Sequence, residues 1–220
     1  HTHALREVRL LAPVIPGKVL AIGLNFRSHL RDRPAPQRPE PFLKAPNCII
    51  GPEEPILLPP DAGRVDAEGE LVVIIGKRCR GVSPKEALSY VLGYTCGNDV
   101  SAREWQLGEG RDLQWWRAKS ADTFGPLGPI IVTDFNPSRM DLRTRVNGKE
   151  AQRADASDLI FDIPSIISFI SRYVTLEPGD AIFTGTPGVT PTLNPGDVVE
   201  VEVAGVGVLR NPVQKALAPG

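Results

Sequence analysis

The chain has 220 residues, of which 41% are hydrophobic and 23% are charged, and its formal net charge is −1. This is the composition of a globular protein, and it excludes disordered, collagen-like and coiled-coil chains. A near-neutral chain lacks the basic surface of a nucleic-acid-binding protein, and no apolar run approaches the roughly 18 residues of a membrane span. We therefore expect a globular protein that binds neither nucleic acids nor membranes.

The first half of the chain predicts short strands and irregular segments. A strand is expected at 18–23, and a long loop without helix or strand follows at 24–41, where four prolines and four arginines gather. The apolar run 69–76 predicts a buried central strand. A capping box with proline at the first helical position, Ser83-Pro-Lys-Glu86, predicts a helix that continues through Leu92.

The rest of the chain predicts more strands and one long helix. A strand is expected at 94–99, and the capping box Ser101-Ala-Arg-Glu104 predicts a short helix directly after Val100. Further predictions are strands at 123–132 and 142–146, an Asn-Gly hairpin turn at 147–148, and an apolar helix from Asp162 or Ile163 through Tyr173. The last fifty residues predict strands joined by Pro-Gly turns.

The three cysteines give a prediction about the cellular compartment. Cys48, Cys79 and Cys96 are odd in number and widely spaced, which argues against a disulfide framework or a zinc ribbon. The first ten residues carry charges at Arg6, Glu7 and Arg9, a pattern not typical of a secretory signal. We expect buried thiols and a cytoplasmic location.

Three acidic residues are candidate metal ligands. Glu68 and Glu70 are two positions apart at the start of the apolar strand, so their side chains point to the same face. Two carboxylates this close repel each other unless a cation or a proton lies between them, and hard divalent cations prefer carboxylate oxygens. Asp99 follows the next predicted strand, where strand ends commonly hold ligands. The alternatives are a solvated strand end for the pair and a local cap for Asp99.

Other side chains have the chemistry of a catalytic site. His29 lies in the proline-rich loop with Asp32 three residues later, and a carboxylate can orient a histidine that acts as a general base. A solvent-exposed histidine is the alternative. Lys119 is either catalytic or simply solvated. The segment Thr184-Gly-Thr-Pro187 either presents hydroxyl and N–H groups to a carboxylate or forms a turn.

These segments occur together, and in this order, in one family. The chain resembles the fumarylacetoacetate hydrolase family, in particular its short bacterial members, over nearly everything from Val19 to Val213. The segments that carry the resemblance are Gly23–His29, Phe42–Lys44, Glu68–Gly76, Gly93–Arg103, Arg117–Pro129, Val146–Gly148, Leu176–Pro187 and Pro195–Val203.

The resemblance implies a fold and an assembly. The fold is a β-rich α+β domain, described as a mixed β-roll or barrel with a few short helices. Residues 18–220 would form this catalytic domain behind a short N-terminal arm at 1–17, and two copies would form a homodimer. The resemblance also implies that Mg²⁺ or Mn²⁺ is held by Glu68, Glu70 and Asp99.

The resemblance further implies roles for residues around the metal. The catalytic residues would be His29, on a mobile lid, and Lys119, while the substrate would contact Arg103, Gln106 and Thr186. Asp32 is also predicted to be catalytic, because with His29 it would move the proton or activate water. The chain departs from the family pattern at one lid position. Relatives with a His-x-x-Glu lid carry glutamate where this chain has Asp32, and the shorter side chain predicts a looser pairing with the histidine.

The resulting functional prediction is metal-dependent catalysis on a small 2-oxo acid through an enolate that the cation stabilises. Hydrolysis of the carbon–carbon bond of acylpyruvates, or decarboxylation of oxaloacetate, is the first choice. An isomerase of the 2-hydroxyhepta-2,4-diene-1,7-dioate type, from aromatic catabolism, is the alternative. From another class, the shorter acid at Asp32 and the altered lid suggest a catalytically degenerate binding protein.

Overall fold

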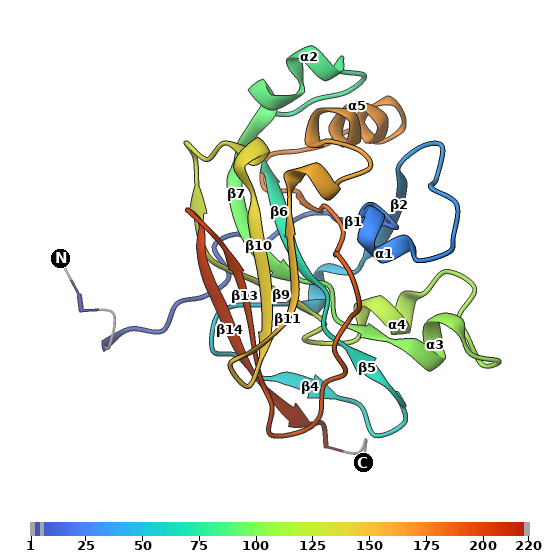
Figure 1. The fold of residues 1–220 in the computed structure, drawn as a ribbon. Helices are drawn as coiled ribbons and strands as arrows, with labels where there is room; N and C mark the ends of the chain where they lie inside the picture. Colours follow the sequence, from blue (N-terminus) through green and yellow to red (C-terminus); the bar gives the residue numbers. More distant parts are fainter. Residues whose placement is uncertain (1–2, 5–6, 218–220) are drawn as a thin grey trace.

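The computed structural model describes residues 3–4 and 7–217 (Figure 1). The strands are β1 (Val19–Gly23), β2 (Glu40–Lys44), β3 (Ile49–Ile50), β4 (Ile56–Leu58), β5 (Val65–Asp66), β6 (Gly69–Ile75), β7 (Val91–Asn98), β8 (Ser101–Ala102), β9 (Gly125–Val132), β10 (Asp141–Val146), β11 (Lys149–Asp155), β12 (Ala181–Phe183), β13 (Val198–Val203) and β14 (Gly207–Lys215). The helices are α1 (Arg27–Leu30), α2 (Pro84–Ala87), α3 (Arg103–Leu107), α4 (Trp116–Ser120) and α5 (Ile163–Tyr173).

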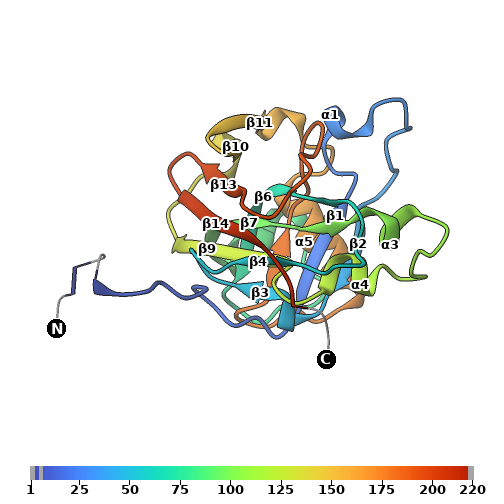
Figure 2. The ribbon, with the colours of Figure 1, turned by 90° about the horizontal axis from the view of Figure 1, so that it is seen from below.

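Two mixed sheets form the body of the protein. The larger has seven strands in the order β2-β1-β12-β6-β7-β9-β3, and the smaller has five in the order β11-β10-β13-β14-β4. Seen from below, the smaller sheet curves around β6 and β7 (Figure 2). A separate pair, β5 and β8, joins the chain segments that precede and follow the β6–β7 hairpin. This β-rich arrangement with few short helices agrees with the predicted fold class.

The core lies between the two sheets. All seven residues of β6 are buried, as the apolar run from Leu71 to Ile75 predicts for a central strand. Leu71 and Val73 of β6 share one hydrophobic cluster with Val201 and Val203 of β13. Burial of each such side chain contributes about 1.5–3 kcal/mol, so this interface fixes the position of β6. The candidate functional residues at the start of β6 are therefore attached to a strand that is buried along its whole length.

Helix α5 forms where its capping and apolar pattern predict it. Asp162 accepts a hydrogen bond from the Ser165 N–H at 2.9 Å, and Pro164 stands at the start of the helix. Its buried face packs into the core cluster and includes Ile163, Ile166, Ile167 and Ile170. In Figure 1, α2 and α5 lie at one end of the sheets, whereas α1, α3 and α4 lie along one side.

Three predicted element boundaries are wrong. The helix from Ser83 ends as α2 and a 3₁₀ turn, because Val91 already pairs with Ile75 in the sheet and the tertiary pairing outweighs the local helix signal. Ser101 begins β8 instead of capping a helix, and its hydroxyl donates to the Asp99 carbonyl oxygen at 2.8 Å. The loop 24–41 is not entirely irregular, since it contains α1 and the start of β2.

Other expectations are tested by the same structure. The three cysteines are buried free thiols, as predicted. The Asn-Gly turn at 147–148 joins β10 to β11. Within the described ranges, no helix is long and apolar enough to cross a membrane. The predicted arm at 1–17 is described only in part, because residues 1–2 and 5–6 lie outside the described residues, and its described portion precedes β1 without contributing a strand.

Candidate metal centre and active site

A cavity of about 670 Å³ opens on the side of the molecule that carries α1, α3 and α4. The predicted site residues that line it are His29, Asp32, Glu68, Glu70, Asp99, Arg103, Gln106, Lys119 and Thr186. The structure therefore brings all nine together around one space, although they are separated by up to 157 positions in the sequence.

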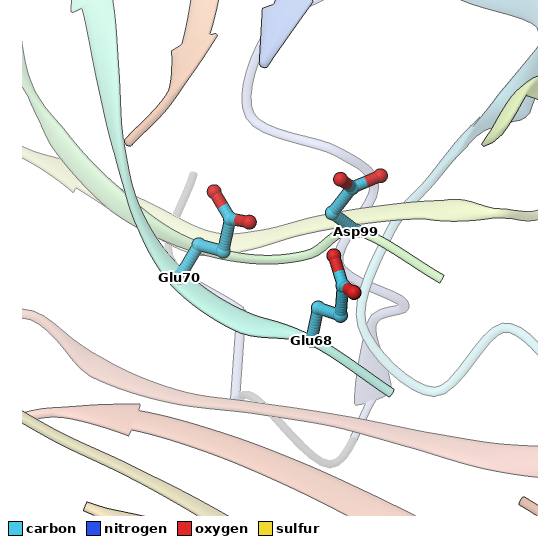
Figure 3. Close-up of side chains that lie close together, drawn as sticks. All are labelled: Glu68, Glu70 and Asp99. Atoms are coloured by element: carbon cyan, nitrogen blue, oxygen red, sulfur yellow. The ribbon is translucent and has the colours of Figure 1, made fainter. Parts of the chain in front are cut away.

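Three buried carboxylates meet in the wall of this cavity. Glu68 directly precedes β6, Glu70 is the second residue of that strand, and Asp99 directly follows β7. Their three carboxyl groups lie close together (Figure 3). One oxygen from each carboxylate lies within 4.8 Å of the others. Their exposed fractions are only 1–5%. The geometry agrees with the predicted set of ligands for one divalent cation.

Backbone pairing brings the three acids together. In the β6–β7 ladder Gly69 is paired with Asn98, which places the residues flanking this pair side by side. The Asp99 N–H donates to the Glu68 carbonyl oxygen at 2.9 Å, and the Glu68 N–H donates to the Asn98 side-chain oxygen at 2.9 Å. A shift of one residue in this register would turn the carboxylates to the other face, so the site depends on the ladder.

Lys119 lies directly against the acidic cluster. From α4, its Nζ donates to Glu68 Oε2 at 2.8 Å and to Asp99 Oδ2 at 2.6 Å. Burial opposes the charge on Lys119, but the carboxylates of Asp99 and Glu68 outweigh it and raise the pKa of the ammonium group. Lys119 is therefore a fixed positive charge at neutral pH, with one N–H left to donate into the cavity.

A second buried lysine, Lys44, was not among the predicted site residues. Its side chain is fully buried at the end of β2, and Nζ donates to Asp99 Oδ1 at 2.7 Å and to the Phe124 carbonyl oxygen at 3.0 Å. It also donates to the Lys119 carbonyl oxygen. Lys44 thus holds both Asp99 and the segment that carries Lys119. The sequence signal that could have identified Lys44 is its place in Phe42–Lys44, one of the segments that carry the family resemblance.

Glu70 has a different environment from its two neighbours. Its Oε2 accepts a hydrogen bond from the Gly185 N–H at 2.6 Å, and no lysine or arginine of the described residues forms an ion pair with it. Burial, followed by the charges of Asp99 and Glu68, raises the pKa of Glu70 well above its usual range. For Glu68, burial is outweighed by Lys119 and Arg103, which lower its pKa. A buried carboxylate that lacks a cationic partner at this point fits the ligand set of an added cation.

The Thr184-Gly-Thr-Pro187 segment supplies the N–H group that binds Glu70. Gly185 has φ of +102°, a conformation that residues with a side chain rarely adopt, and this turn aims its N–H at the carboxylate. The Thr186 hydroxyl donates to the Gly69 carbonyl oxygen at 3.0 Å and accepts from Gln152 Nε2 at 2.9 Å. The predicted substrate contact of Thr186 is therefore limited to the one lone pair that remains.

Arg103 is held in place by several partners. Its Nη2 donates to Glu68 Oε1 at 2.6 Å, and its Nη1 donates to Gln106 Oε1 at 2.7 Å. Its Nε donates to Asp66 Oδ2 at 2.8 Å. Because the oxygen of Gln106 accepts from Arg103, the amide nitrogen of Gln106 remains free to donate to a ligand. Asp66 was not predicted, although it continues the alternation of Glu68 and Glu70 by two positions.

His29 lies on α1 and is half-buried. Its Nδ1 is 2.7 Å from the Gly188 carbonyl oxygen, and since a carbonyl only accepts, Nδ1 carries the hydrogen and Nε2 has the free lone pair. Burial lowers the pKa of His29 below 6.5. Asp32 lines the same cavity, but no hydrogen bond joins it to His29 in this structure. Gly188, rather than Asp32, orients the imidazole here.

This geometry can be compared with that of known proteins. The fumarylacetoacetate (FAA) hydrolase C-terminal family matches residues 18–214. The chain belongs to the fumarylacetoacetate hydrolase family. A curated relative, the mitochondrial oxaloacetate tautomerase FAHD2A of Bos taurus, is 41% identical over 220 residues, which cover 94% of this chain and 70% of the relative.

Two solved structures confirm the fold of this family member. The 5-carboxymethyl-2-hydroxymuconate delta-isomerase from Mycobacterium smegmatis matches with a TM-score of 0.92 and 47% identity, covering 99% of this chain and 86% of that protein. The 2-hydroxyhepta-2,4-diene-1,7-dioate isomerase from Mycobacterium marinum matches with a TM-score of 0.90 and 45% identity, covering 98% and 81%. The predicted family and fold class are therefore confirmed, and the named relatives are enzymes.

Proposed function

We propose that this protein is a divalent-metal-dependent enzyme that moves a proton between the enol and keto forms of a small 2-oxo acid. The observation that carries the proposal is the meeting of three buried carboxylates in the wall of a cavity that also presents Arg103, Lys119 and the His29 imidazole. The isomerase and tautomerase relatives support proton transfer as the reaction.

Glu68, Glu70 and Asp99 would hold Mg²⁺ or Mn²⁺, because all three offer hard oxygen ligands. Such a cation supplies the positive charge that stabilises a developing enolate. The chain's own contribution at this end of the cavity is electrostatic. Arg103 and the third N–H of Lys119 balance the carboxylate of the substrate, and the free amide nitrogen of Gln106 donates a hydrogen bond that fixes its orientation.

His29 would carry the proton. In the neutral tautomer that the Gly188 carbonyl selects, Nε2 accepts a proton from the carbon next to the keto group and returns it to the enolate at another atom. The reaction balances without a co-reactant, since the proton leaves and re-enters the same molecule. Lys119 cannot play this role at neutral pH, because both of its carboxylate partners hold it in the charged form.

Carbon–carbon bond hydrolysis and decarboxylation, the first choice from the sequence, become the second candidate. Both proceed through the same enolate, so the residues above would serve them equally. They rank lower because the named relatives are an oxaloacetate tautomerase and two isomerases. The homodimer and the cytoplasmic location stay predictions.

The test is a panel of 2-oxo acids assayed with Mg²⁺ and with Mn²⁺. We expect the enzyme to accelerate the decay of enol absorbance and the exchange of solvent deuterium into the carbon next to the keto group. Chelation should abolish both effects, and added metal should restore them. The E70Q variant with the same free metal controls for catalysis by the ion alone.

The panel also separates the alternatives. Release of CO₂ or of a cleaved acid at the rate of enolisation would assign the lyase or hydrolase reaction in place of tautomerisation. Neither exchange nor cleavage above the E70Q background, with any member of the panel, would overturn the proposal and favour the catalytically degenerate binding protein.

A further inference from the structure

Arg64 has no role in the chemistry described above, yet it lines the same cavity. It precedes β5, and its backbone is fixed on both sides by α3. Its N–H donates to Glu104 Oε2 at 2.6 Å, and its carbonyl oxygen accepts from the Arg103 N–H at 2.8 Å. Its side chain is 52% exposed, so the guanidinium stands at the solvent-facing part of the cavity.

The guanidinium of Arg64 is held in one orientation by a buried acid. Its Nε donates to Asp66 Oδ1 at 2.8 Å and its Nη2 donates to Asp66 Oδ2 at 2.9 Å. Asp66 is itself fully buried and accepts hydrogen bonds from Arg103, Thr190 and Thr192. A paired fork of this kind fixes the plane of the guanidinium. The remaining nitrogen, Nη1, has no hydrogen-bond partner among the described residues.

Asp66 also connects Arg64 to the residues around the acidic cluster. It binds Arg64 on one side and Arg103 on the other, and Arg103 in turn contacts the metal-ligand candidate Glu68. The Arg64 guanidinium, with its free Nη1 donor, is thus held in a fixed position relative to the acidic cluster. This arrangement suits a ligand with one charged group at the cluster and a second charged group farther out.

The charge of the cavity wall also suits a ligand with two charged groups. Its lining contains the basic side chains Arg31, Arg33, Arg64, Arg103 and Lys119 and the acidic side chains Asp32, Asp66, Glu68, Glu70 and Asp99. With His29 neutral, the two sets balance. Lys44, buried behind the lining, adds one more positive charge at Asp99. A divalent cation at the acidic cluster would therefore leave a net positive charge, which favours a ligand with more than one negative charge.

We propose that Arg64 is the specificity residue of the proposed reaction, and that it binds the distal carboxylate of a 2-oxo dicarboxylate through Nη1. This rests on the proposed function. Two other arginines line the cavity but are less suited. Arg33 donates to the His29 and Leu30 carbonyl oxygens of its own segment, and Arg31 is exposed and has no hydrogen-bond or ion-pair partner in the described part of the chain. Arg64 alone of the three is oriented by a buried carboxylate.

The experiment compares ligands that differ only at the far end. Binding to the Mg²⁺-loaded protein is measured by calorimetry for 2-oxo dicarboxylates of four to seven carbons, and for monocarboxylates of the same length that end in a methyl group. R64Q is compared with the wild type, and R31Q is the matched control, since it removes the same charge from the same cavity. Thermal midpoints and affinity for Mn²⁺ are recorded for all three proteins.

We expect the wild type to prefer the dicarboxylate at one or more chain lengths by about tenfold, the value of one hydrogen bond between charged groups. R64Q should lose this preference while keeping its affinity for the methyl-ended ligands and for Mn²⁺. R31Q should keep the preference. A preference that survives in R64Q, or that R31Q abolishes equally, would overturn the assignment to Arg64.

Failure of the underlying function gives a different result. If the loaded wild type binds neither series at any length, the proposed 2-oxo acid site is itself wrong, and the assignment of Arg64 falls with it. If both series bind equally well, the site for the 2-oxo acid stands and only the role of Arg64 is overturned. A fall in the thermal midpoint of R64Q without any change in preference would assign Arg64 a structural role.

Discussion

The acidic cluster and the histidine segment face the same cavity but are held in very different ways. Glu68, Glu70 and Asp99 are buried at the ends of two paired strands in the middle of the seven-stranded sheet. His29 lies on a single turn of helix, between the end of β1 and the start of β2, and is half-exposed. The proposed metal ligands thus lie in the buried centre of the sheet, and the proposed proton carrier lies on a short, partly exposed segment.

Most of the hydrogen bonds that hold α1 to the rest of the protein are exposed. The Ser28 N–H and hydroxyl donate to the two carboxylate oxygens of Asp158 at 3.0 and 2.5 Å, and Arg27 donates to the carbonyl oxygens of Ser157 and Leu159. Exposed contacts of this kind contribute less than the strand ladder beneath the acids. Substitutions in the two regions should therefore separate metal affinity from turnover.

The largest effect is expected for E70Q. The change removes one charged ligand while keeping the size of the side chain, so Mn²⁺ affinity and turnover should fall together, turnover by more than about 10³-fold. Calorimetry with Mn²⁺ and the tautomerisation assay measure the two losses. The exposed carboxylate of Glu40 provides the control, because E40Q makes the same change outside the cavity.

Stability of the metal-free E70Q protein should not fall with activity. Because the folded-state pKa of Glu70 is raised, the wild type loses stability as the pH rises from the ordinary pKa through the raised one. E70Q has no proton to lose there, so its thermal midpoint in chelator should exceed that of the wild type more at pH 8 than at pH 4. A lower midpoint at every pH would show that the loss of activity reflects damage to the fold.

The second largest effect is expected for H29A. Loss of a positioned acid–base group should lower turnover by roughly 10²–10⁴-fold, and Mn²⁺ affinity should stay within twofold because the ladder that holds the acids is untouched. Turnover and calorimetry are measured on the same preparation. An unchanged turnover rate would show that His29 takes no part in the reaction. A loss of Mn²⁺ affinity as large as the loss of turnover would show that the two regions do not have separate roles.

A smaller effect is expected when α1 is released without altering His29. D158A removes the two hydrogen bonds that Ser28 donates, whereas the one that its hydroxyl accepts from the Gly188 N–H remains. Displacement of a catalytic group by about 1 Å can cost up to about 10²-fold in rate. We expect kcat to fall and Mn²⁺ affinity to remain. D61A is the control, because Asp61 is exposed and its side chain forms no hydrogen bond with the described residues. Equal rates for D158A and wild type would show that α1 does not depend on this anchor.

The pH profile tests the state of His29. Burial lowers its pKa, so the neutral, proton-accepting form dominates at pH 7, and kcat/KM should decline only as the pH drops below 6.5. The decline approaches tenfold per pH unit once the pH is below the pKa. H29A should lack this limb. A limb centred above 6.5, or one that persists in H29A, would assign the titration to another group.

The smallest effect is expected for D32E. The resemblance to the family predicts glutamate at this position of a His-x-x-Glu lid, and the longer acid extends the reach toward His29 by one methylene. We expect a rise of a few-fold in kcat, the scale of one additional exposed charged hydrogen bond. D32N tests the opposite direction and should leave kcat nearly unchanged, since Gly188 already orients the imidazole. A large loss of kcat in D32N would show that Asp32 is a catalytic residue.

The sequence by itself determined the features that depend on the local spacing of apolar and polar residues. The apolar run of β6, the position of Glu68 and Glu70 on one face of it, and the capped helix α5 all follow from spacings of two or of three to four residues. The ordered motifs then predicted which distant residues share the cavity, including Asp99 and Lys119. These expectations agree with the structure because each rests on a pattern that neighbouring residues enforce.

Only the tertiary structure decided the partners of those residues. Lys44 meets Asp99 across 55 positions, and His29 meets the Gly188 carbonyl across 159, and no local pattern encodes either contact. The same reason explains why the helix from Ser83 is short: pairing of Val91 with β6 buries the chain as a strand. Local sequence sets which conformations are favourable, whereas burial and pairing across the sheet select among them and fix which side chains touch.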